Sequence, residues 1–308
     1  MQARTFTLVT DSAASLPASL IKEYDIRVLP LTYIVGGKEY DGARVTENDT
    51  KTYYEMMRAK VPMSTSCTNE DDVEVVLRGI LENGEDILYI GFSSALSATY
   101  TVVASVLTRL AEEYLDRQVY YTDSLCASFG EGRFVIQAAH KRAEGLDASA
   151  VYAWAEGNKQ KQCHLFTVES LTYLFRGGRV GRASYLLAGA LNIKPVMHVD
   201  DRGRLVAIGK ALGRKASLNA LATRCAATIV SPQEQVIYIA HGDCREDAEY
   251  LAERIQEKIT VKGVVYAYVD LVVGVHSGPG TVALFYTGEN RMVTTAGAPA
   301  TVAATVAD

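Results

Sequence analysis

Four hydroxyl-bearing side chains, Ser93, Ser94, Ser97 and Thr99, lie within seven residues of one another. They follow the apolar run 87–91 and precede a helical pattern, so they cluster where a strand passes into a helix. A helix N-terminus offers unpaired N–H groups and a partial positive charge. With the added hydroxyls, the cluster predicts a small site for an anion or a carboxylate. The alternative interpretation is ordinary capping of the helix by Ser94 or Ser97.

A second polar run, 64–71, contains Thr65 and Ser66 and opens another predicted helix. Its spacing fits a capping box, and on its own the run favours capping. His276 is expected at a strand end, followed by Ser277 and Gly278 in a sharp Gly-Pro-Gly turn. A histidine held there can bind a carboxylate or act as an acid or base, or it can simply complete the turn.

Three arginines, Arg176, Arg179 and Arg182, fall within seven residues and are separated by glycines. Guanidinium groups in this arrangement suit a phosphate or an acidic partner surface, although a solvated turn is the plainer interpretation. The loop therefore supports one alternative function, a regulator that binds a sugar or a phosphate in a short polar pocket.

The sequence matches no common catalytic template. No G-x-x-x-x-G-K-[ST] and no H-E-x-x-H is present, and the five cysteines are scattered without a C-x-x-C pair. These patterns indicate no metal, no cofactor and no disulfide framework. A second alternative remains, a serine hydrolase or acyltransferase with Ser93 or Ser94 as nucleophile and His276 as base. Asp11 or Asp123 would then orient the histidine.

Composition excludes several classes of partner. The 308 residues carry a formal net charge of −5, whereas nucleic-acid binding needs a basic surface. No apolar run reaches the roughly 18 residues of a membrane span, so at most a transient membrane contact is expected. The first residues do not resemble a signal peptide, and the sequence predicts a cytoplasmic protein with reduced thiols.

The predicted strands and helices indicate where the polar clusters lie in the fold. Apolar strands at 6–10, 87–91 and 118–122 each lead through a small-residue turn into a helix, which favours a parallel sheet with helices on both faces. Asp11-Ser12 and Asp123-Ser124 follow two of these strands, at the carboxyl edge where open α/β sheets bind ligands. Residues 28–66 read as a small excursion that contains a hairpin.

The second half of the chain has a different pattern. A hairpin is expected over 194–209, followed by strands near 236–240, 264–275 and 282–286. The sequence therefore predicts a two-domain α/β fold. A Rossmann-like N-terminal domain (1–165) precedes a C-terminal α/β domain with a mixed or antiparallel sheet (166–288). The Ala-, Thr- and Val-rich residues 289–308 are expected to be a loose tail.

Seven short motifs occur in one order along residues 5–288. They are Thr10-Asp11-Ser12, Thr65-Ser66, Gly91 to Tyr100, Asp123-Ser124, Gly130-Glu131-Gly132, Leu171 to Arg179 with Ile193-Lys194-Pro195, and His276 to Gly280. Together they resemble the DegV family. The resemblance implies a two-domain lipid-binding protein that encloses a long-chain fatty acid and presents its carboxylate to a separate fatty acid kinase subunit. That kinase uses ATP to make an acyl phosphate for phospholipid synthesis, so the protein is not expected to be an enzyme on its own.

The resemblance also implies roles for particular residues. Thr65, Ser66, Ser94 and His276 correspond to the expected carboxylate contacts, and Arg179 to the mouth of the pocket. Ser93, Ser97, Ser277 and Gly278 are expected around that site, and Arg176, Arg179 and Arg182 on the surface that meets the kinase. Two positions depart from the family pattern. Cys67-Thr68 replaces the usual Gln-Pro, and Ser277 stands where threonine is common.

Overall fold

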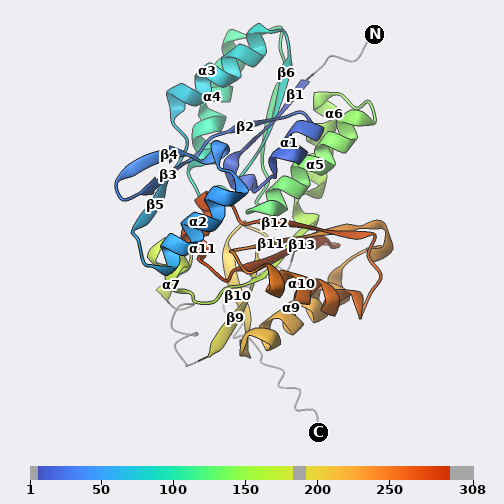
Figure 1. Cartoon of the computed structure of the whole chain (residues 1–308). Coiled ribbons are helices and arrows are strands. Elements are labelled where there is room, and N and C mark those ends of the chain that lie inside the picture. Colours follow the sequence, from blue (N-terminus) through green and yellow to red (C-terminus); the bar gives the residue numbers. More distant parts are fainter. Residues whose placement is uncertain (1–5, 183–191, 292–308) are drawn as a thin grey trace.

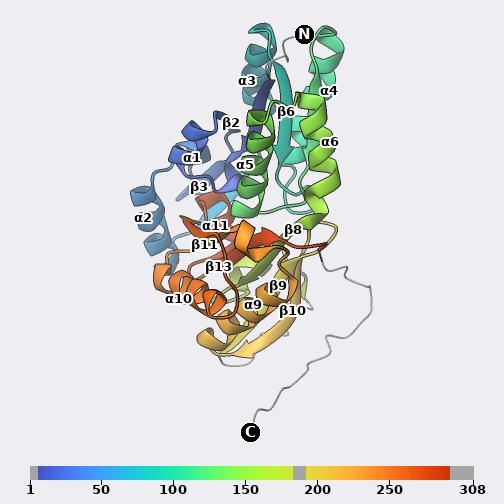
Figure 2. The same cartoon turned by 90° about the vertical axis from the view of Figure 1, so that its right-hand side faces the viewer.

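Three β-sheets organise the chain in the computed structural model, which describes residues 6–182 and 192–291. Sheet A has four parallel strands in the order β2-β1-β6-β7. Figures 1 and 2 show it in the upper part of the molecule, between two pairs of helices. The strands are β1 (Phe6–Asp11), β2 (Ile26–Leu29), β6 (Asp86–Gly91) and β7 (Val119–Asp123).

Side chains along the strands of sheet A point alternately to its two faces, and helices cover both faces. Leu8 and Leu88 pack on one face against α5 (Phe129–Ala143) and α6 (Ala148–Asn158). Val9 and Tyr89, each one residue further along, pack on the other face against α3 (Glu70–Glu82) and α4 (Thr99–Glu113). Successive strand residues point to opposite faces, so an apolar strand covered on both sides is buried throughout. Helix α1 (Ala18–Glu23) links β1 to β2.

After β2 the chain leaves sheet A and forms a small antiparallel sheet. It contains β3 (Thr32–Val35), β4 (Lys38–Asp41) and β5 (Met63–Ser66), in the order β4-β3-β5. Helix α2 (Glu47–Arg58) connects β4 to β5 and begins with a complete capping box at Thr46 and Asp49. The apolar residues 28–35 suggest one strand, but they belong to two, because Pro30 interrupts the pairing between β2 and β3.

Sheet C has six strands in the order β10-β9-β8-β13-β11-β12, and only β11 and β12 run parallel. Helices α9 (Arg214–Thr228) and α10 (Arg245–Gln256) pack on one face. The other face packs against α5, which therefore lies between sheets A and C. The remaining bounds are β8 (Gln162–Thr167), α7 (Thr172–Arg176), β9 (Ile193–Val199), β10 (Leu205–Leu212), β11 (Val236–His241), β12 (Gly263–Tyr268), α11 (Leu271–Ser277), β13 (Val282–Thr287) and the short 3-10 helices Ser12–Ala14, Gly42–Arg44, Lys159–Lys161 and Pro232–Glu234.

The two-domain α/β class is confirmed, with a parallel first sheet and a mixed second sheet. Two expected features of the fold differ in the structure. The apolar run 264–275 is not one strand, because Asp270 caps a new helix, α11, that ends at Gly278. The expected boundary after residue 165 falls inside β8, so we propose a boundary before Gln162 instead. The run 183–191, whose Ala, Gly and Leu residues predict an apolar helix, and most of the tail lie outside the described residues.

Candidate functional site

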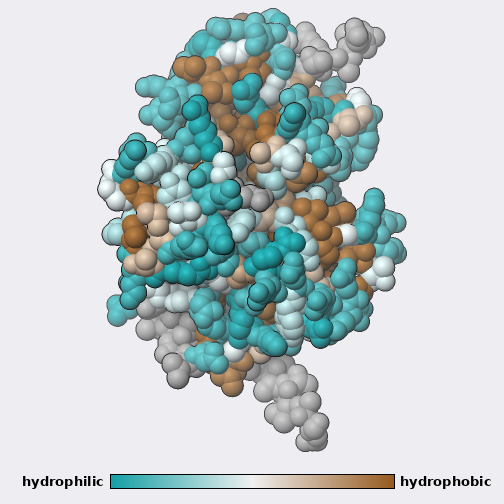
Figure 3. Space-filling view, in the orientation of Figure 1, coloured by the Kyte–Doolittle hydropathy of each residue, from teal (hydrophilic) through white to brown (hydrophobic). Residues whose placement is uncertain are grey.

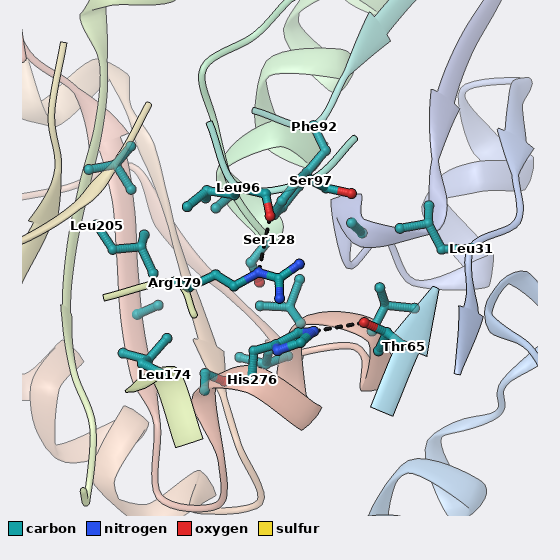
Figure 4. Close-up of a pocket in the computed structure, with 18 of the residues that line it drawn as sticks. Leu31, Thr65, Phe92, Leu96, Ser97, Ser128, Leu174, Arg179, Leu205 and His276 are labelled. Carbon is teal, nitrogen blue, oxygen red and sulfur yellow. Dashed lines mark hydrogen bonds between the residues drawn. The ribbon is translucent and has the colours of Figure 1, made fainter. Parts of the chain in front are cut away.

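A cavity of about 270 Å³ lies between the two larger sheets and the small sheet. We call it the acyl cavity, after the ligand expected from the sequence. Its lining comes from turns at the carboxyl edge of sheet A, from the α5-facing side of sheet C, and from β5 and α11 (Figure 4). Most of its walls are apolar, from Ala13, Leu31, Phe92, Leu96, Ala127, Phe166, Leu174, Val199, Leu205, Val269, Val272, Val273, Ala283 and Phe285.

Thr65 and His276 meet at the β5 end of this cavity. The Thr65 hydroxyl lies 2.7 Å from Nε2 of His276, although the two residues are 211 positions apart in the chain. Thr65 is in β5 and His276 is in the last turn of α11, not at a strand end as expected. Burial, aided by the positive charge of Arg179, lowers the pKa of His276 to about 4. The imidazole is therefore neutral at pH 7, with one donor and one acceptor nitrogen.

Arg179 crosses the cavity between the two halves of the molecule, as Figure 4 shows. Its Nε donates to the carbonyl oxygen of Leu96 at 3.1 Å, and its Nη1 donates to the carbonyl oxygen of Gly177. Burial lowers the pKa of Arg179, but the guanidinium keeps its charge near neutral pH. No carboxylate of the described chain forms an ion pair with Arg179, so its positive charge can attract an anion to this cavity.

The other expected site residues divide into two groups. Ser66, Ser97 and Ser277 line the cavity, and the buried Ser277 hydroxyl has no hydrogen-bond partner within the described part of the chain. The residues that do not line it are Ser93, Ser94, Arg176, Arg182 and Gly278. Ser94, Arg176 and Arg182 are exposed, and Gly278 ends α11 with φ of +81°. Ser97 thus lines the cavity and Ser94 does not, and the Ser97 hydroxyl also accepts from the N–H of Thr99 at 3.2 Å at the start of α4.

The hydrolase alternative requires a serine hydroxyl beside His276, and the structure does not bring them together. Ser93 is buried and its hydroxyl donates to the Gly203 carbonyl oxygen at 2.9 Å, away from His276. Asp11 accepts from Tyr89 and from backbone N–H groups, and Asp123 accepts from the N–H of Ser94. A nucleophilic serine needs a base within hydrogen-bond reach. The only hydrogen-bond partner of His276 Nε2 among the described residues is the hydroxyl of Thr65.

Buried carboxyl groups beside the cavity were missed by the sequence analysis. Asp270 caps α11 by accepting from the Val273 N–H at 3.0 Å, and its other oxygen accepts from the Ser15 hydroxyl. Ser15 in turn lies 2.8 Å from the hydroxyl of Ser128, which lines the cavity. This chain joins the helix that carries His276 to the turns of sheet A. Burial raises the pKa of Asp270 to about 6.

We expect Asp270→Asn to stabilise the protein increasingly as pH rises. Between pH 4 and 6 the folded wild type holds a proton that the unfolded chain releases, so its stability falls across this window and levels off above it. Asparagine cannot ionise, and its amide can replace the protonated carboxyl. The difference in unfolding free energy between variant and wild type should grow by about 2 kcal/mol from pH 4 to 6, most of the roughly 3 kcal/mol that a pKa change of about two units sets in total. Urea unfolding at several pH values measures this, and a difference independent of pH would contradict it.

The described residues contain neither a membrane-spanning helix nor a cluster of metal ligands. Of the helices in residues 6–182 and 192–291, none combines the length and the apolarity needed to cross a membrane. Over the same ranges, no group of three or more histidine, cysteine or acidic side chains is placed to hold a metal ion.

Hydrophilic residues cover most of the face drawn in Figure 3, and apolar residues there form separate groups.

The family model described as "Uncharacterised protein, DegV family" matches residues 5–289 of the chain. A DegV domain-containing protein from Clostridium perfringens is 40% identical over 288 residues, which cover 94% of this chain and 99% of that protein. A second such protein, from Clostridium acetobutylicum, is 32% identical over 281 residues and is covered over 96% of its length.

Solved structures of similar proteins agree with the fold. A DegV family protein from Thermus thermophilus, described by its fatty acid binding, is 28% identical and superposes with a TM-score of 0.81. The superposition covers 92% of this chain and 99% of that one. A DegV lipid-binding protein from Thermotoga maritima gives a TM-score of 0.80 over 94% of this chain and 100% of that one. At 23% identity, that second likeness shows the fold alone.

Proposed function

The chain belongs to the DegV family, and on that premise we propose that it binds a long-chain fatty acid. The acyl chain occupies the acyl cavity, and the carboxylate lies beside Thr65 and His276. The observation that carries this proposal is an apolar cavity that ends in a hydrogen-bonded Thr–His pair. The fatty acid binding described for the Thermus thermophilus relative supports the same ligand.

The walls account for affinity toward an alkyl chain. Each methylene group moved out of water contributes about 0.8 kcal/mol. Phe166, Val272 and Phe285 offer apolar surface from two sides of the cavity. A hydrocarbon chain fits such walls, whereas a sugar would leave its hydroxyl groups without partners along them. The regulator alternative is therefore less well supported.

The polar end accounts for recognition of the carboxylate. With its proton on Nε2, His276 donates to Oγ1 of Thr65, which leaves the Thr65 hydroxyl free to donate to the ligand. Ser66 and Ser97 line the cavity and provide further donors, and the Arg179 guanidinium supplies the positive charge. Neutral donors keep the carboxylate satisfied without holding both of its oxygens in a bidentate arginine pair.

We further propose that a separate kinase subunit phosphorylates the bound ligand in the cytoplasm. One carboxylate oxygen attacks the γ-phosphorus of ATP, the bond to ADP breaks, and an acyl phosphate and ADP are formed. The polar end of the cavity lies beside exposed residues, Ser66 and Cys67, so the carboxylate is within reach of a partner. Arg176 and Arg182, which are exposed, are the proposed docking positions, together with Arg179 in the cavity. The acyl phosphate then serves phospholipid synthesis.

This partnership is tested with a bacterial fatty acid kinase subunit that binds ATP. We expect labelled acyl phosphate from γ-labelled ATP only when the kinase, this protein and a fatty acid are all present. Arg176→Ala combined with Arg182→Ala should raise the concentration of this protein needed for half-maximal rate, without changing its fatty acid affinity. Acyl phosphate formed equally well without this protein would contradict the proposal.

Gly177→Ala offers a narrow test of the position of His276. A Cβ atom at residue 177 would lie 2.3 Å from Nδ1 of His276, so the imidazole must move away from Thr65. The backbone itself tolerates alanine, because φ at this position is −72°. We expect fatty acid binding to weaken about tenfold, the effect of losing one hydrogen bond to a charged group, with little change in Tm. Gly181→Ala is the matched control, since its Cβ would meet no atom within 4 Å.

A further inference from the structure

Two residues separate the acyl cavity from a second, smaller cavity. That second cavity has a volume of about 150 Å³, and its lining includes His198, Arg224 and Tyr286. We call it the rear pocket. His164 and Val199 are the only residues of the described chain that line both spaces, so they form a dividing wall between them. Both are buried, at 3% and 2% exposed.

Strand register places both side chains of the wall on the acyl-cavity face of sheet C. Phe166 in β8 is paired with Met197 in β9, and both pack toward α5. His164 and Val199 are each two residues away from this pair, and the antiparallel register brings them side by side. Residues two positions apart in a strand point to the same face. His198, one position from Val199, points the other way and lines the rear pocket.

The His164 ring is held in place by its surroundings. Its Nδ1 donates to the carbonyl oxygen of Gln162 at 3.0 Å, and its Nε2 accepts from the Ala127 N–H at 3.2 Å. A Cβ atom at Gly130 would lie only 2.1 Å from Nε2, so α5 packs directly on the ring. Burial, aided by the charge of Arg291, holds the pKa of His164 well below its usual range. The ring is therefore neutral, and it offers the ligand a surface rather than a hydrogen bond.

Arg291 closes the space beside the wall. The pairing of β8 with β9 ends at Leu165 and His198. Beyond that point, Arg291 donates from Nε to the Gln162 carbonyl oxygen at 2.8 Å and from Nη1 to the Asp200 carbonyl oxygen at 3.4 Å. These hydrogen bonds join the two strands on the side where their own ladder stops. The spacing between β8 and β9 at the wall is therefore fixed.

The wall lies across the cavity from the proposed carboxylate site. Val199 is paired with Leu205 in the ladder of β9 and β10. Figure 4 shows Leu205 and Thr65 on opposite sides of the cavity. An acyl chain that starts beside Thr65 and crosses the cavity therefore meets the wall with its methyl end. On the far side of the wall, Arg224 and His198 give the rear pocket a polar lining, which does not suit a methyl group.

We propose that Val199 and His164 set the longest acyl chain that the protein binds tightly. A chain shorter than the limit gains affinity with each added methylene group, about fourfold per group. A chain longer than the limit cannot displace a close-packed wall, so its extra carbons gain nothing or disturb the carboxylate contacts. This inference rests on the proposed function, to which it adds a length limit and the residues that impose it.

Isothermal titration calorimetry on the full chain, stripped of ligand, tests the inference. The probes are saturated fatty acids from dodecanoic to icosanoic acid, in steps of one carbon. For the wild type we expect the dissociation constant to fall with each carbon up to one length and then to stop falling. Val199→Ala removes two methyl groups from the wall, so the limit should move up by about two carbons. The acid two carbons beyond the wild-type limit should then bind about 15-fold more tightly than it binds the wild type.

Val199→Leu provides a second variant, because it adds one carbon to the wall and should move the limit down by about one carbon. Val272→Ala is the matched control. It removes the same two methyl groups from a residue that lines the acyl cavity but not the rear pocket. We expect it to weaken binding without moving the limit.

Several results would overturn the inference and leave fatty acid binding intact. One is a limit at the same length in the wild type and both Val199 variants, and another is affinity that rises through the whole series in the wild type. A limit that Val272→Ala moves as far as Val199→Ala does would also overturn it, because cavity width would then set the length. If no acid binds the wild type, the proposed function itself fails.

Discussion

Ala283→Phe is expected to weaken fatty acid binding by about two orders of magnitude. Ala283 is in β13, is 7% exposed, and lines the acyl cavity opposite the turns of sheet A. A phenyl ring there occupies space that the acyl chain would fill. Displacing about four methylene groups at about 0.8 kcal/mol each removes about 3 kcal/mol of binding free energy, a factor of roughly 100–200.

The measurement is the dissociation constant for a series of saturated fatty acids of increasing length. The loss should be small for short chains and should grow with length, because only longer chains reach the new ring. Ala216→Phe, which adds the same ring at an exposed position of α9, is the control and should bind as the wild type does. Equal losses for every chain length would mean that Ala283 does not line the path of the chain.

His276→Ala should weaken binding of all fatty acids by about 10–100-fold, as expected for a hydrogen bond to a charged group. The reason is that Thr65 loses its partner and the carboxylate loses an organised donor. The effect should not depend on chain length, which separates it from the effect of Ala283→Phe. Thr65→Val, which keeps the shape of the side chain, should give a similar loss.

The methyl esters of the same acids provide the control for the head group. An ester cannot accept a charge-assisted hydrogen bond as a carboxylate does. We expect His276→Ala and Thr65→Val to change ester binding far less than acid binding. If both ligands weakened equally, the Thr–His pair would be a structural feature of the cavity rather than its carboxylate site.

The parallel first sheet could be predicted because its strands are short apolar runs that lead into amphipathic helices. Leu8 and Val9 show why, since neighbouring residues are buried on opposite faces. The run 264–275 could not be resolved in the same way. Its β-branched residues suit a strand, but Asp270 starts a helix within the run, and that helix continues beyond it to Gly278. Local periodicity does not distinguish the two when an apolar run is short and buried.

Only part of the site could be predicted from the sequence. Thr65 and His276 are 211 residues apart, so their contact follows from the packing of β5 against α11, and only the family resemblance suggested both. Spacing also could not decide between Ser94 and Ser97, because the turn after β6 sets which of the two residues lines the cavity. Arg291 falls in a segment expected to be loose, yet it is buried and joins β8 to β9. A lone arginine in an Ala-, Thr- and Val-rich segment was the available signal.

Mass spectrometry of the purified full chain tests fatty acid binding most directly. Under native conditions we expect a population heavier than the polypeptide by the mass of one long-chain fatty acid. Organic extraction should release that species, and the stripped protein should take up one equivalent of added fatty acid. A protein that carries no acyl ligand, and that remains unliganded when fatty acid is added, would contradict the account.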